Sequence, residues 1–62
     1  MKTWMILSNY RHCGLAFAVN VEERRIKRSM RLRPELCRKM ALQIVRTALV
    51  QSINDGSFYH AA

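Results

Sequence analysis

The fold is organised by the stretch PELCRKMALQIVRTALVQSIN, residues 34–54, which predicts one long helix. Pro34 disfavours helical geometry at the preceding Arg33 and suits the first turn of a new helix. Gly56 supplies a good stop just beyond the last turn. The apolar residues of this stretch are Leu36, Cys37, Met40, Ala41, Leu42, Ile44, Val45, Ala48, Leu49, Val50 and Ile53.

The apolar arc of this helix is too wide for the rest of the chain to cover. A typical surface helix has an apolar stripe a little over 100° wide, whereas this arc exceeds half of the circumference. We therefore expect a second copy of the chain or a partner protein to cover it. The predicted contact residues are Leu42, Val45, Leu49 and Ile53. Alternatively, the preceding basic segment folds over the arc through Ile26, Met30 and Leu32.

The N-terminal third predicts an antiparallel β-hairpin. Residues 3–8 are short and apolar, residues 9–14 carry turn-forming types that end in Gly14, and residues 15–21 alternate strictly. One face of the second strand would carry Leu15, Phe17, Val19 and Val21, and we expect Phe17 to lie in the core.

The segment 22–32 between the hairpin and the long helix fits two structures. Asn20 followed by Glu23 resembles a helix cap with its capping partner, and Arg, Lys and Met are good helix formers. Apolar and basic residues nevertheless alternate from Ile26 to Arg33, which is the period of a strand. We predict a short basic helix here, with a third strand as the alternative, and an α+β fold for the chain.

Length and composition limit the chain to a single small domain, residues 1–62. A domain of this size buries only about 60% of its unfolded surface and usually depends on disulfides, metals or a partner. The N-terminal apolar run is too short for a secretory signal, and no stretch approaches the roughly 18 apolar residues of a membrane span. We expect a cytoplasmic protein in which Cys13 and Cys37 stay reduced.

The charge of the chain is strongly positive and concentrated. The net charge is +7, and six of the ten residues from 24 to 33 are Lys or Arg with no acid among them. Such a block favours an anionic partner, and arginine in particular makes bidentate contacts to phosphate. We predict that DNA or RNA binds here. The predicted contacts are Arg24, Arg25, Lys27, Arg28, Arg31 and Arg33, with Arg38 and Lys39 at the margin.

A second hypothesis uses the same residues differently. A small inhibitor or adaptor, of the scale found among phage and plasmid regulators, would dock on a partner protein through the apolar face of the long helix. The arginines would then steer the chain to an acidic surface. In both hypotheses the protein is not an enzyme and forms a homodimer or a complex.

No spacing of residues indicates catalysis or a metal. His12, Cys13, Cys37 and His60 lack the close, recurrent pairs of a structural zinc site. A Cys–His nucleophile would need a third orienting group, and the sequence supplies none. We therefore predict neither a cofactor nor a metal ion.

The stretch RSMRLRPEL, residues 28–36, resembles the strand and first-helix start of ribbon-helix-helix DNA-binding proteins. That resemblance implies that Lys27, Ser29 and Arg31 face the major groove. The family has two helices separated by a loop, and residues 34–54 are too short for both and contain no break. The fold of the family is therefore not carried over to this chain.

Overall fold

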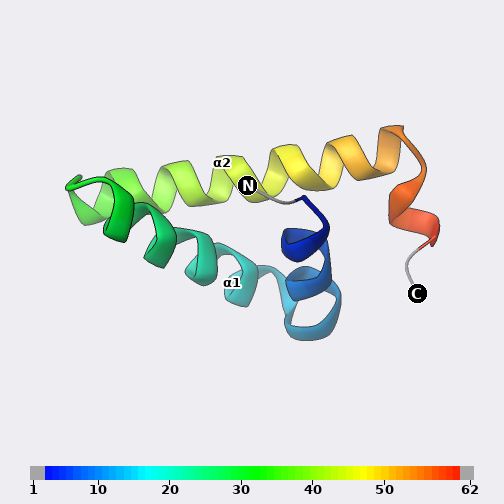
Figure 1. Cartoon of the computed structure of the whole chain (residues 1–62), viewed down its shortest axis with the longest axis horizontal. Helices are drawn as coiled ribbons and strands as arrows, with labels where there is room; N and C mark the ends of the chain where they lie inside the picture. The colour runs from blue at the N-terminus through cyan, green and yellow to red at the C-terminus, as the bar shows by residue number, and fades with distance from the viewer. Residues whose placement is uncertain (1–2, 61–62) are drawn as a thin grey trace.

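A computed structural model describes residues 3–60, apart from the side chains of Ser57 and His60. Two helices make up most of it: α1 (Thr3–Ser29) and α2 (Pro34–Asn54). A short 3₁₀ helix, η1 (Ser57–His60), follows α2. α2 runs along the length of the molecule, and α1 lies against one side of it in two differently oriented segments (Figure 1).

The predicted α+β class is wrong, because residues 3–60 contain no strand. The two expected strands, 3–8 and 15–21, both lie within α1. The segment from residue 15 to 29 has a helical period, since the buried Ala18, Glu22 and Ile26 recur every four positions, with the buried Val19 beside Ala18. An isolated two-stranded hairpin is only marginally stable in water, whereas a helix packed along α2 buries a whole face. Phe17, expected in the core, is 44% exposed.

A sharp bend at Gly14 divides α1 into segments 3–13 and 15–29. The backbone there has φ 89° and ψ 175°, a conformation that is open essentially to glycine alone. The turn predicted over 9–14 is thus confined to this residue, because residues 9–13 are helical. The bend lets segment 3–13 fold back toward α2 (Figure 1). Arg11 then lies over the ring of Phe58 in η1, with its guanidinium carbon 4.5 Å from the ring centroid.

The basic segment is helical only as far as Ser29, where it forms the end of α1 rather than a separate helix or a strand. Residues 30–33 connect it to α2, which has the predicted bounds 34–54. At the start of α2 the N–H of Cys37 donates to the carbonyl of Arg33 at 3.0 Å. At its end the N–H of Asp55 donates to the carbonyl of Gln51 at 3.0 Å.

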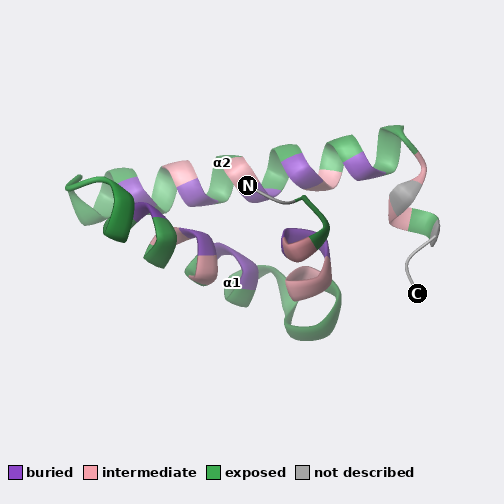
Figure 2. Cartoon of the chain, viewed as in Figure 1, coloured by how far each residue is buried: buried purple, intermediate pink, exposed green. Residues whose placement is uncertain are grey.

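The core is a seam of mostly small side chains between the two helices, shown in purple in Figure 2. α2 contributes Cys37, Ala41, Val45 and Ala48. α1 contributes Ile6, Ala18, Val19 and Ile26, so both of its segments take part. The small residues of α2 bring the helices close together, and its larger apolar side chains are left half-buried or exposed.

We expect Val45→Ala to destabilise the protein much more than Val50→Ala. Val45 is fully buried in the seam, whereas Val50 is 55% exposed on the same helix. The buried change should lower the free energy of unfolding by about 1–3 kcal/mol, and the exposed one by no more than about 0.5 kcal/mol. Urea unfolding followed by circular dichroism measures both, and equal losses would contradict the placement of Val45.

Gly14→Ala tests the bend. A Cβ at this position meets no neighbouring atom within 4 Å, so any cost comes from the backbone conformation and not from a clash. We expect a loss of about 1–3 kcal/mol in unfolding free energy, because an alanine does not readily adopt the positive φ. The control is the reverse substitution, Ala16→Gly, at an exposed position of the neighbouring helical segment. A more stable Gly14→Ala protein would show that α1 is one continuous helix.

Candidate nucleic-acid interface

The eight cations predicted to bind an anion lie around one end of the molecule, where residues 30–33 connect α1 to α2. This end of the helical hairpin, on the left in Figure 1, is called the hairpin end below. These cations come from the last turns of α1, the connection 30–33 and the first turns of α2. All eight are exposed. The fold therefore brings the predicted set together at one end of the molecule, although the segment that carries most of it has a different structure from the one expected.

Three of the eight cations are paired with carboxylates. Arg25 lies 3.8 Å from Glu22 (Nε to Oε2), and Lys27 lies 3.5 Å from Glu23 (Nζ to Oε2). Arg38 reaches across from α2 to Glu23, with Nη1 and Oε1 3.3 Å apart. Both glutamate side chains are largely buried between the helices. All three cations thus have part of their charge neutralised, and the pair of Arg38 with Glu23 also joins the two helices.

The other five cations have no carboxylate partner among the described residues. They are Arg24, Arg28, Arg31, Arg33 and Lys39. Arg24 and Arg28 are four residues apart and therefore lie one above the other on the side of α1 that faces away from α2. Their charges point to solvent, where no acid of the described chain competes with an external anion.

Exposed apolar side chains lie among these cations. Met30 and Leu32 belong to the connection 30–33, and Leu36 to the first turn of α2. Each is between 39% and 49% exposed. The hairpin end thus presents both positive charge and apolar contact area, and an anionic polymer with apolar faces would engage both.

The four residues predicted to dock a second copy or a partner do not share one surface. Val45 is fully buried in the seam, and Leu49 is half-buried against it. Leu42 and Ile53 are 40% and 46% exposed on one flank of α2. Leu42 lines a hollow there with Leu15 of α1 and with Arg38.

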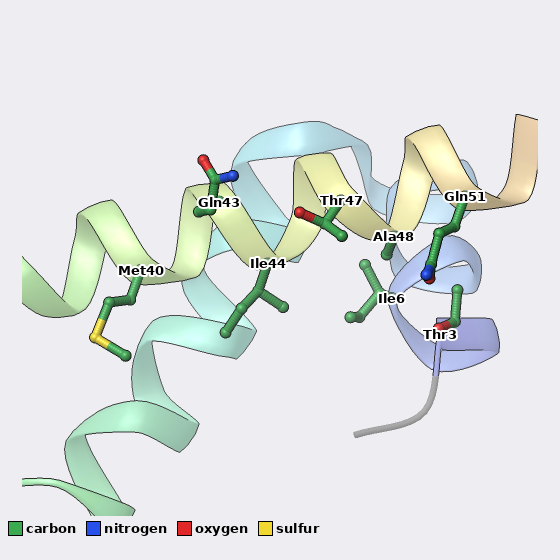
Figure 3. A pocket seen from close by; sticks show the side chains of 8 residues that line it. All are labelled: Thr3, Ile6, Met40, Gln43, Ile44, Thr47, Ala48 and Gln51. Atoms are coloured by element: carbon green, nitrogen blue, oxygen red, sulfur yellow. The ribbon is translucent and has the colours of Figure 1, made fainter.

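The opposite flank of α2 carries a larger groove, formed against segment 3–13 of α1 (Figure 3). Its volume is about 290 Å³. Ile6, Met40, Ile44 and Ala48 give it an apolar floor, and Thr3 and glutamine side chains form its rim. None of the described side chains that line it is charged.

Residues 3–60 contain no cluster of three His, Cys, Asp or Glu side chains that could hold a metal ion, with the side chain of His60 outside the described part. Cys13 is exposed and Cys37 is buried, and both are free thiols. Within the same residues, neither helix has an apolar stretch of the length that a bilayer requires.

The division of the cations into paired and unpaired sets was missing from the sequence prediction. Part of it was visible there, because Glu22 and Arg25 are three residues apart, and Glu23 and Lys27 four. The contact from Arg38 required the packing of α2 on α1. Comparisons of the chain with protein-family models, with curated proteins and with solved structures found no match.

Proposed function

We propose that the protein is a non-enzymatic regulator that binds nucleic acid through the unpaired cations at the hairpin end. The observation that carries this proposal is that Arg24, Arg28, Arg31, Arg33 and Lys39 are exposed, adjacent and without carboxylate partners among the described residues. Phosphates bound there would displace counterions from the nucleic acid, which makes the binding strong and sensitive to salt.

The position of the charge, and not the net charge alone, supports this function. A basic face that served only solubility would need no particular arrangement. Here the two glutamates pair with cations near the seam, while the outward-facing Arg24 and Arg28 stay free. Arginine also offers a planar set of donors that matches phosphate oxygens or a guanine edge.

We expect Arg28→Gln to weaken binding to a fluorescent duplex by roughly 3- to 10-fold and to reduce the salt slope by about one unit. Arg46→Gln is the matched control, since it removes the same charge from an exposed position about three helical turns from the hairpin end. It should change the affinity by less than roughly twofold. Equal losses from both variants would mean that net charge alone attracts the oligonucleotide.

The wild-type protein should show a steep dependence on salt. About five phosphate contacts predict a slope near −4.5 in a plot of log K against log salt, or a loss of roughly 10²–10³ in affinity between about 50 and 200 mM. Fluorescence anisotropy with duplex and single-stranded oligonucleotides measures this slope. No micromolar-range binding at low salt, or binding to anionic lipid vesicles but not to oligonucleotides, contradicts the proposal.

A second candidate function rests on the flank that carries Leu15 and Leu42. These exposed leucines adjoin Arg38 at a hollow, and an apolar contact beside a cation suits an acidic protein partner. Binding of that kind would change little with salt and would be lost on Leu42→Asp. Binding of nucleic acid at the hairpin end would survive this substitution.

A further inference from the structure

The outer face of α1 carries a row of exposed side chains. Asn20, Arg24 and Arg28 recur every four positions, and at 100° per residue Phe17 falls within the same arc of about 80°. All four residues are exposed. The buried residues of segment 15–29 lie on the opposite side of the helix, so this outer row points away from α2 (Figure 2).

No acid interrupts the outer row. Within α1 the two acids are Glu22, which is buried toward α2, and Glu23, which pairs with Lys27 and Arg38. The next acid along the chain, Glu35, belongs to the first turn of α2. A polyanion that approaches the outer row therefore meets two arginines and no carboxylate on that face.

Asn20 is the member of the row that helix stability does not explain. It lies inside α1 and not at its start, and asparagine is a poorer helix former there than alanine. Its exposed side chain makes no hydrogen bond to another described residue. A free amide offers both a donor and an acceptor, which is the pair of groups that matches the major-groove edge of adenine.

We propose that the outer face of α1 lies in the major groove of duplex DNA, where Asn20 reads a base. This inference rests on the proposed function and adds to it the groove and the residue that distinguishes sequences. Arg24 and Arg28 follow Asn20 along the groove and contact guanine edges or phosphates. Phe17, which is 44% exposed one turn before Asn20, contacts a thymine methyl group.

The dimensions of the helix fit this groove. An α-helix with its side chains is about 10–12 Å across, and the major groove of B-DNA is about 12 Å wide. From Asn20 to Arg28 the helix rises about 12 Å, which spans about three or four base pairs at roughly 3.4 Å each. α2 packs on the opposite side of α1 and stays outside the groove. The major groove of duplex RNA is too narrow for side chains to read, so the geometry favours DNA.

Fluorescence anisotropy with the full chain tests the groove. A DNA duplex, the RNA duplex of the same sequence and the single-stranded DNA are compared at one salt concentration. We expect the DNA duplex to bind roughly fivefold or more tightly than either of the other two. Comparable binding to all three, or tighter binding to RNA or to the single strand, overturns this inference and leaves the proposed function standing. Absence of binding to all three overturns both.

Asn20→Ala tests the base contact, with a DNA duplex selected from a random-sequence pool and a scrambled duplex of the same composition. Binding to the selected duplex should weaken by roughly fivefold or more, and binding to the scrambled duplex by less than roughly twofold. The salt slope should stay that of the wild type, because no phosphate contact is lost. Alanine favours the helix more than asparagine does, so unfolding does not explain a loss, and circular dichroism verifies this.

Gln43→Ala is the matched control, since it removes an exposed amide from α2 and should leave both affinities unchanged. Equal losses from Asn20→Ala on the two duplexes, or no loss on either, would show that Asn20 reads no base. A selection that enriches no sequence would overturn the assignment in the same way. Each of these results leaves the salt-dependent binding by the unpaired cations untouched, so the two proposals fail separately.

Discussion

The close packing of α1 against the small side chains of α2 is the contact on which the other features of the molecule depend. Cys37, Ala41 and Ala48 line the seam and are almost completely buried. Their size lets α1 approach, and the buried apolar area offsets the ordering of a short chain. The larger residues of α2, including Leu36 and Val50, are then left outside the seam. The exposed apolar area is thus a direct result of how the helices pack.

The same packing decides which cations are available to a ligand. Glu22 and Glu23 have largely buried side chains between the helices, and they pair with Arg25 and Lys27 along α1. Glu23 also holds Arg38 of α2, so one carboxylate joins the two helices. The cation of each pair is exposed to solvent, which screens the attraction and keeps its contribution to stability small. Their larger effect is to leave the positive charge that faces outward, at the hairpin end, without an internal partner.

Local signals in the sequence were sufficient to predict the bounds of α2, but they did not identify α1 as a helix. Pro34 and Gly56 mark the two ends of α2 because each has a conformational requirement that acts on its own. The alternation from Leu15 to Val21 satisfies two periods at once, and only packing against α2 selects the helical one. Gly14 was correctly placed at a change of direction, but the change is a bend between two helical segments and not a hairpin turn.

The candidate site was predictable in composition but not in geometry. The basic residues were named from their density in the chain, whereas their partners depended on which of them faced the seam. Val45 was placed on an outer surface because the apolar arc of α2 is wide. Which part of such an arc turns inward depends on the helix that packs against it, and residues 3–8 and 15–21 were expected to form strands and not that helix. The row of Asn20, Arg24 and Arg28 became recognisable only once α1 was located.

The backbone conformation of residues 15–29 tests this account most directly. Arg24 and Arg28 share one face only if this segment is helical, and the seam takes Ala18, Val19 and Ile26 from the same helix. Cα secondary chemical shifts from NMR of the full chain report the backbone conformation residue by residue. The account predicts helical shifts from Leu15 to Ser29 and in the preceding segment 3–13, with a break only at Gly14. Extended shifts across residues 15–21, with cross-strand contacts to residues 3–8, would contradict it.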